Sequence, residues 1–196
     1  MLFRSHFLRS GVGDVVSNIS AIADWRLSHE LTGEPLDGVA AALASTAAEA
    51  VLAQPGKSAE PAFLRCLAEA LILSGLAMSA AGTSRPCSGA CHEISHALDH
   101  LYPGVGSHGE QVAIGALFAT FVRGDASRVR HMADVFERHG LPLTPTEIEL
   151  TESQFVEAVL YAPATRPDRF TILEHLDLDE PSAVRAVHEF VEFVRC

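Results

Sequence analysis

Residues 88–111 read SGACHEISHALDHLYPGVGSHGEQ, and this stretch sets the pattern for the whole chain. A helix is expected from just after Ser88 and Gly89 to about Leu101, where Tyr-Pro-Gly-Val-Gly interrupts it. Proline and glycine form turns, so a second helix is expected to begin near His108. The stretch therefore predicts two helices joined by a short loop, which places them antiparallel and side by side.

The same pattern continues on both sides of this stretch. Apolar residues recur at three- and four-residue spacing, and clusters of Gly and Pro fall where helices would end. Further helices are expected over residues 14–31, 36–52, 59–81, 126–139, 146–161 and 181–194, with a proline-rich connector at 162–168. No pair of strands is predicted. The fold class is therefore all-α, a helical bundle in a single domain over residues 1–196, with residues 1–10 as a short leader or truncated remnant.

Composition and charge exclude several classes of function. Asp and Glu outnumber Lys and Arg by 25 to 14, so the surface field repels phosphate backbones and nucleic acid is not an expected partner. The four cysteines form no Cys-x-x-Cys pair and no dense framework, which fits a reducing cytoplasm. Charges scattered through the first ten residues argue against an export signal. The most apolar stretch, residues 70–82, is shorter than the roughly 20 residues of a bilayer span, so we expect a buried helix and no membrane span.

A dinucleotide site is also not expected within this chain. Such a site needs a strand, a glycine-rich turn and a helix in one βαβ unit. The only similar sequence, Gly11-Val12-Gly13, lacks the third glycine and a preceding strand.

Histidines dominate the chemistry of residues 88–111. His92 and His96 are four residues apart, so they project from the same face of a helix and can converge on one point. His96 and His100 repeat this spacing, and spacing alone does not choose between the two pairs. His108 begins the next helix and can supply a further ligand. Imidazoles with a carboxylate are a common set of ligands for Zn²⁺ or Fe²⁺.

Spacing does not identify the carboxylate, and other interpretations compete with the histidine site. The candidate carboxylates are Asp14, Glu93, Asp99 and Glu110. Cys87 and Cys91 are also one turn apart and could join His92 in a different metal site, but a fourth ligand at ordinary zinc spacing is lacking. Helical histidines are also often surface or capping groups, and a free cysteine is more often a small buried group.

Three segments of the chain together resemble a known family. Residues 84–99 with 108–115 are similar to the metal-site region of sn-glycerol-1-phosphate dehydrogenases, which belong to the superfamily of iron-containing alcohol dehydrogenases, glycerol dehydrogenase and dehydroquinate synthase. Residues 11–29 and 166–173 agree with the same family. The resemblance spans nearly the whole chain and implies the C-terminal, helical, metal-binding domain of that fold.

The resemblance implies a role for individual residues. The Asp of the family's Gly-x-Gly-Asp motif falls on Asp14, and the other two metal ligands fall on His92 and His108. His96 corresponds to the catalytic histidine near the substrate hydroxyl, and Asp14 and His96 are expected to contact substrate. Arg85 resembles a contact to substrate phosphate, although a surface arginine is an equal interpretation. One divalent metal is expected, with zinc ahead of iron or nickel, and it would polarise an alcohol for hydride transfer to NAD(P).

The chain also departs from the family pattern. The family enzymes carry a nucleotide-binding domain before the Gly-x-Gly-Asp motif, where this chain has about ten residues. Asn18 and Cys91 stand where a Lys and a Glu are usual, and Ser17 stands where dehydroquinate synthases place a Lys. NAD(P) would therefore need a nucleotide-binding domain supplied from elsewhere.

We expect the catalytic metal-binding half of a polyol or polyol-phosphate dehydrogenase. The alternatives are a non-catalytic metal-binding or assembly module, one subunit of a split enzyme, and a dehydroquinate synthase-like lyase. The expected partners are a small polyol or polyol phosphate, a separate nucleotide-binding subunit and, in a homo-oligomer, further copies of the chain.

Overall fold

The computed structural model describes residues 2–57 and 60–195, and these residues contain no strand. In chain order they form α1 (Leu2–Thr32), α2 (Gly38–Ala53), α3 (Pro61–Ala81), α4 (Ala90–Leu101), α5 (His108–Val122), α6 (Ala126–His139), the 3-10 turn η1 (Pro145–Ile148), α7 (Glu152–Thr165), α8 (Ile172–Leu176) and α9 (Glu180–Arg195). The all-α prediction is confirmed.

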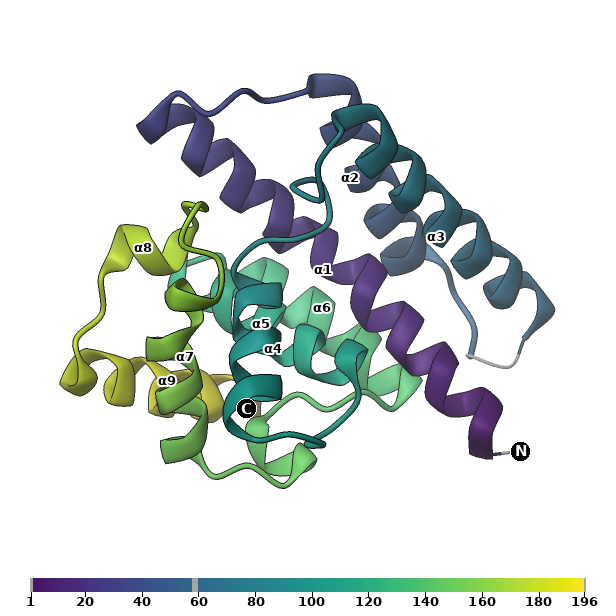
Figure 1. The fold of residues 1–196 in the computed structure, drawn as a ribbon. Coiled ribbons are helices and arrows are strands. Elements are labelled where there is room, and N and C mark those ends of the chain that lie inside the picture. Colours follow the sequence, from purple (N-terminus) through teal and green to yellow (C-terminus); the bar gives the residue numbers. More distant parts are fainter. Residues whose placement is uncertain (1, 58–59, 196) are drawn as a thin grey trace.

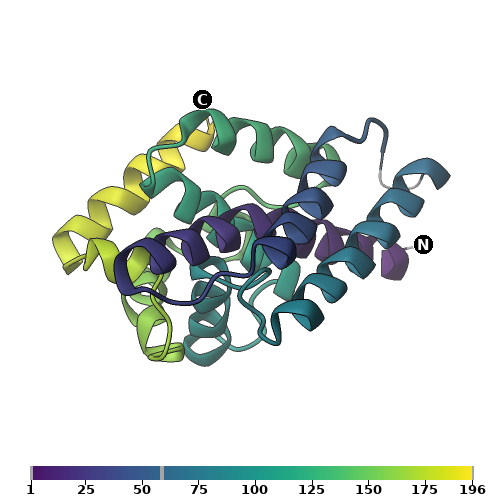
Figure 2. The ribbon, with the colours of Figure 1, turned by 90° about the horizontal axis from the view of Figure 1, so that it is seen from above.

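The long helix α1 divides the molecule (Figure 1). The antiparallel pair α2 and α3 packs on one side of α1, and α4 to α9 gather on the other side. Viewed from above, α1 runs across the middle of the molecule (Figure 2). α5 lies at the centre of the larger group, where it contacts α1, α4, α6 and α9. Phe118 of α5 is fully buried and meets Phe155 and Phe190 edge to face, so apolar burial holds α7 and α9 onto the centre.

α1 begins much earlier than the sequence predicted. The prediction started this helix at Asp14 and treated residues 1–10 as a leader or remnant, but residues 2–10 are the first turns of α1. Gly11 and Gly13 suggested a break because glycine weakens a helix. Both lie inside α1, and Gly13 sits where α1 touches α5. Packing overrides propensity at this position.

The segment between α6 and α8 also differs from the prediction. Residues 146–161 were expected to be one helix, but Glu149 adopts a left-handed conformation, with φ of 65°, and ends η1. α7 then begins after Thr151, whose hydroxyl accepts a hydrogen bond from the backbone N–H of Gln154. The expected connector at 162–168 contains the last turn of α7, and Pro163 lies inside that turn. The short helix α8 was not predicted.

α3 is longer than the apolar stretch that the sequence analysis singled out. The predicted start at Ala59 lies outside the described residues, and α3 has 21 residues from Pro61 to Ala81. Among the described helices, it is long and apolar enough to cross a membrane, by length and composition only. The expectation of a buried helix over residues 70–82 is wrong for most of the stretch. Ala70 and Ala77 are buried, but Leu71, Ile72 and Leu76 are exposed because α3 packs on α2 and α1 with one face only.

Candidate metal centre

Two glycines bring α1 and α5 into close contact beside the site. A Cβ placed on Gly13 would lie 2.1 Å from the carbonyl oxygen of Gly109, and one on Gly109 would lie 2.2 Å from the carbonyl oxygen of Ser10. The Gly109 N–H also donates to Ser10 Oγ at 3.2 Å. Asp14 directly follows Gly13, and His108 directly precedes Gly109, so this contact places their side chains opposite each other.

A buried carboxylate fixes the start of α4, where His92 stands. Asp24 is fully buried in α1 and accepts hydrogen bonds from the Ala90 N–H at 2.8 Å and the Ile172 N–H at 2.7 Å. Its remaining partner is the guanidinium of Arg123, with which it forms an ion pair. Asp24 therefore ties α1 to the N-termini of α4 and α8 and to the end of α5, which orients the first turn of α4.

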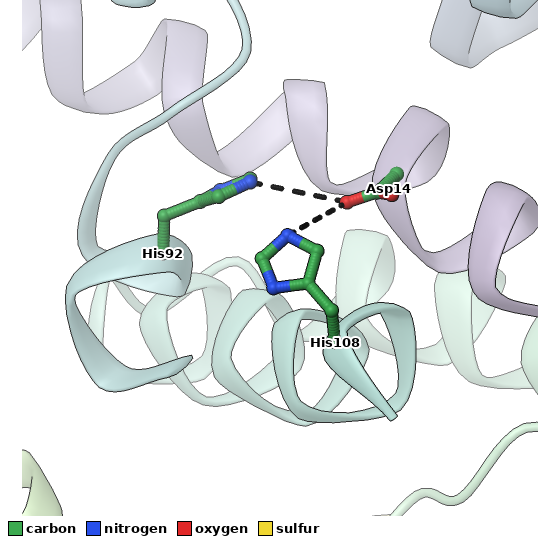
Figure 3. Close-up of side chains that lie close together, drawn as sticks. All are labelled: Asp14, His92 and His108. Carbon is green, nitrogen blue, oxygen red and sulfur yellow. Dashed lines mark ion pairs between the residues drawn. The ribbon is translucent and has the colours of Figure 1, made fainter. Parts of the chain in front are cut away.

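Asp14, His92 and His108 converge on one point (Figure 3). Asp14 Oδ1 lies 3.4 Å from His108 Nε2 and 3.9 Å from His92 Nε2, and one ligand atom from each residue lies within 4.8 Å of the others. Donors around tetrahedral zinc are about 3.3 Å apart, given zinc–nitrogen bonds of about 2.0 Å. The three side chains therefore fit a small divalent ion with modest inward movement, and three donors leave a position open for substrate.

Burial and charge set the protonation of the two imidazoles. Burial, together with the neighbouring His108, His96 and Arg169, lowers the pKa of His92 to about 4, against an opposing effect of Asp14. His92 is therefore neutral at physiological pH and offers a lone pair. The hydrogen bond to Asp14 raises the pKa of His108, so an ion at this point competes with a proton on His108.

The other predicted imidazoles lie outside this cluster. The His96 ring is 6.4 Å from the His92 ring, centroid to centroid, and meets it edge-on. Burial, followed by Arg166 and His108, lowers the pKa of His96. His100 is exposed and stacks on Tyr161 with centroids 5.1 Å apart, so it faces α7.

Of the four candidate carboxylates, the structure brings only Asp14 to the imidazoles. Glu93 is buried and accepts a hydrogen bond from the Thr171 hydroxyl at 3.1 Å. Asp99 accepts a hydrogen bond from Gln111, and Glu110 accepts one from Ser107 at the start of α5. Each of these three carboxylates is thus engaged elsewhere.

The competing cysteine site is not assembled among the described residues. Burial raises the pKa of Cys87 to about 11 and that of Cys91 to about 12, so both thiols are protonated at neutral pH. A metal ligand must be the thiolate. Cys91 Sγ lies 3.3 Å from His92 Nδ1, on the side of the ring away from Asp14. Both cysteines are small buried groups in the core.

A cavity of about 340 Å³ opens beside Asp14 and His92. Its polar lining also includes Asn18, Ser84, Ser88 and Arg166. The Oδ1 atom of Asn18 is buried and has no hydrogen-bond partner among the described residues, whereas its Nδ2 donates to Ser74. The cavity thus offers one cation, hydroxyl groups and an unused amide oxygen next to the cluster.

Arg85 lies away from this cavity, in contrast to its predicted place at the substrate. Its side chain is 3% exposed and forms an ion pair with Glu34. Its Nη2 atom also donates to the carbonyl oxygen of Phe170 at 3.0 Å. Arg166 is the arginine that lines the cavity, and sequence reasoning assigned it no role. Its place inside the predicted proline-rich connector at 162–168 gave no signal, because only the tertiary fold brings residue 166 to residue 14.

Comparison with known proteins identifies the relatives of this chain. Glycerol-1-phosphate dehydrogenase [NAD(P)+] of Nitrosopumilus maritimus (strain SCM1) is 42% identical over 182 residues, which cover 91% of this chain and 50% of the relative. The enzyme of the same name from Methanoculleus marisnigri (strain ATCC 35101 / DSM 1498 / JR1) is 44% identical over 182 residues, covering 90% and 49%. The chain is a homologue of glycerol-1-phosphate dehydrogenases. It spans about half the length of these curated relatives, and no protein family model matches it.

Solved structures of glycerol dehydrogenases share the fold of this homologue. A probable glycerol dehydrogenase from Sinorhizobium meliloti 1021 superposes with a TM-score of 0.68 at 23% identity, covering 97% of this chain and 56% of that one. Glycerol dehydrogenase from Schizosaccharomyces pombe gives a TM-score of 0.72 at 16% identity, covering 97% and 51%. The helical fold is therefore that of about half of a glycerol dehydrogenase chain.

Proposed function

We propose that this chain is the metal-binding half of an NAD(P)-linked dehydrogenase that acts on a polyol phosphate such as glycerol 1-phosphate. The observation that carries the proposal is the convergence of Asp14, His92 and His108 beside the cavity. The two relatives described above, which are NAD(P)+-linked glycerol-1-phosphate dehydrogenases, support it. No relative or structural neighbour named above is a lyase, so nothing favours dehydroquinate synthase-like chemistry.

The chain's own residues would hold the reacting groups. Asp14, His92 and His108 would hold one divalent metal, zinc ahead of iron or nickel, which when bound polarises a hydroxyl oxygen and lowers its pKa. The unpartnered Asn18 Oδ1 would accept a hydrogen bond from a substrate hydroxyl in the cavity. His96, the imidazole beside the cluster, would relay the hydroxyl proton, because its lowered pKa favours the neutral ring that can accept it.

Arg166 would bind the phosphate of the substrate. It is the charged guanidinium in the lining of the cavity, and Ser84 and Ser88 add hydroxyl groups beside it. This assignment replaces Arg85, whose guanidinium is paired with Glu34. The described helices form no βαβ unit, so NAD(P) would bind to a nucleotide-binding domain that they do not provide. Three expectations from the sequence stay predictions: a cytoplasmic location, a separate nucleotide-binding subunit and a homo-oligomer.

Metal content measured by elemental mass spectrometry tests the proposal. We expect about one zinc, iron or nickel ion per chain, lost in His92→Ala and in His108→Ala. His131→Ala, at an exposed position on α6, is the matched control and should keep the metal. A parent chain that takes up no metal on reconstitution would refute the metal-dependent proposal and favour the non-catalytic module.

A second experiment separates the enzyme from a metal-binding module. The chain is mixed with the nucleotide-binding half of a curated relative, and NAD(P)-dependent oxidation of glycerol 1-phosphate and of glycerol is measured. We expect activity on the phosphate, and Arg166→Ala should raise KM for glycerol 1-phosphate without a matching change for glycerol. Metal binding without any activity in the mixture would favour the module.

A further inference from the structure

His108 is held by a relay of hydrogen-bonded side chains, Ser95 and Gln111, on the side of its ring away from Asp14. Its Nε2 faces Asp14, and its Nδ1 lies 3.1 Å from Ser95 Oγ on α4. The Ser95 hydroxyl in turn lies 2.6 Å from Gln111 Oε1, one turn along α5 from His108. Ser95 and Gln111 are 0% and 1% exposed, so water does not compete for these contacts.

The contacts of Gln111, at the far end of this relay, determine which atom donates in each of its hydrogen bonds. Gln111 Nε2 donates to Asp99 Oδ1 at 2.9 Å and to the carbonyl oxygen of Val105 at 2.8 Å. Both of these oxygens can only accept, because one is a carboxylate oxygen and the other a backbone carbonyl. The amide nitrogen of Gln111 must therefore face them, which leaves its Oε1 toward Ser95 as an acceptor.

The orientation of Gln111 in turn determines whether Ser95 donates to the His108 imidazole or accepts from it. Since Gln111 Oε1 can only accept, the single hydroxyl proton of Ser95 is used on Gln111. Ser95 Oγ can then only accept from His108, so Nδ1 carries a proton in both the charged and the neutral ring. The proton that Nε2 donates to Asp14 is the second one, and its loss leaves the lone pair on Nε2. Nε2 is the atom that faces Asp14. In metal sites, such partners behind a ligand commonly fix its tautomer and orientation.

We propose that Ser95 and Gln111 are positioning residues that lock His108 in the tautomer able to bind a metal. This inference rests on the proposed function for its purpose, but the tautomer itself belongs to the metal-free chain. Asp99 and Val105 anchor the relay from the end of α4 and from the loop before α5. The loop of the helical hairpin therefore contributes to the ligand set without touching it.

The first test is the tautomer of His108 in the metal-free parent chain. Long-range ¹H–¹⁵N correlation spectra distinguish the two tautomers, and they are recorded at alkaline pH where the ring is neutral. We expect the proton on Nδ1. A neutral ring with its proton on Nε2 and a bare Nδ1 would overturn the proposal, whether or not the chain binds metal.

The second test reverses the relay without touching His108 or Ser95. Gln111→Leu removes the acceptor, so the Ser95 hydroxyl is free to donate to Nδ1 and to move the ring proton to Nε2. We expect this tautomer shift and a zinc affinity about 10- to 100-fold lower, measured by competition with a chelating dye. Ser28→Ala, which removes a buried hydroxyl at the far end of α1, is the control and should change neither reading.

A double-mutant cycle separates positioning from simple packing. In Ser95→Ala the path from Gln111 to His108 is cut, so adding Gln111→Leu should cause little further loss of zinc affinity. Additive losses with an unchanged tautomer would mean that Gln111 only packs the hairpin, and the proposal would fail. A parent chain that has the Nδ1–H tautomer but binds no zinc would refute the proposed function and leave the relay in place.

Discussion

The contact between α1 and α5 predicts a large effect from a single methyl group. In Gly13→Ala the new Cβ would lie 2.1 Å from the carbonyl oxygen of Gly109 and 2.8 Å from its carbonyl carbon. Non-bonded heavy atoms settle at about 3.5 Å, so the two helices must separate by about 1.4 Å. Overpacking of this kind costs about 1–3 kcal/mol, and the helix preference of alanine over glycine returns about 1 kcal/mol. We expect a net loss of about 1 kcal/mol in the free energy of unfolding, from these two terms.

The same movement should weaken the metal centre. Asp14 directly follows Gly13, and His108 directly precedes Gly109. Their facing atoms are 3.4 Å apart, so a shift of about 1.4 Å spoils the ligand geometry. Urea unfolding and zinc competition measure the two effects. Gly75→Ala is the control, because Gly75 lies inside α3 with nothing within 4 Å of a Cβ, and it should stabilise the chain by about 0.5–1 kcal/mol. A Gly13→Ala chain with the stability and zinc affinity of the parent would refute the close-packing argument.

Three further predictions concern the framework of the site. Asp24→Asn should cost about 3–5 kcal/mol in urea unfolding, since it leaves the Arg123 charge without its buried partner; a neutral effect would contradict the anchoring role. Burial raises the pKa of Glu34, but hydrogen bonds from Arg85 and Ser28 outweigh burial and lower this pKa overall. The ionised form of Glu34 therefore stabilises the fold above the unfolded-state pKa, and this contribution is lost as pH falls through the lowered pKa. Glu34→Gln should therefore reduce stability at pH 7 by about 1–3 kcal/mol and match the parent in strong acid, and a pH-independent difference would contradict this. Phe118→Ala should cost about 3–5 kcal/mol by thermal or urea unfolding, because the fully buried ring contacts α7 and α9, and a loss below about 1 kcal/mol would mean that those helices are held by other contacts.

The sequence was sufficient for those elements whose signals are local. The hairpin of α4 and α5 was predicted because a Tyr-Pro-Gly-Val-Gly loop separates two strongly helical segments, and α6 was predicted to the residue because Asp125 and Gly140 cap it. The start of α1 was wrong because Gly11 and Gly13 weaken a helix locally. The glycine at position 13 is required by the tertiary fold, since only a residue without a side chain fits against α5 there.

In the candidate site, too, the sequence predicted what depends on local spacing and not what depends on the tertiary fold. Helical periodicity placed His92 and His96 on one face, but it gave no means to choose among the carboxylates, and only the resemblance selected Asp14. For Arg85 and Arg166, the tertiary fold decides which arginine lines the cavity. Arg85 is close to His92 in the sequence, but burial against Glu34 removes it from the cavity. Arg166 is far from all three ligands in the sequence, and the end of α7 brings it into the lining. No local pattern encodes that exchange.

The cluster proposed to bind metal is preorganised by groups outside the proposed ligand set. Asp14 is placed by the glycine contact between α1 and α5, His92 by the Asp24 anchor at the start of α4, and His108 by the Ser95 relay. Each device is buried and uses different residues, so each can be removed without deleting a ligand. A preorganised site loses little conformational freedom when an ion binds, and affinity then depends on these supports as much as on the donors. Asp24→Asn and Gln111→Leu should therefore lower zinc affinity by independent factors, and their double variant should show the product of the two, because the residues share no partner.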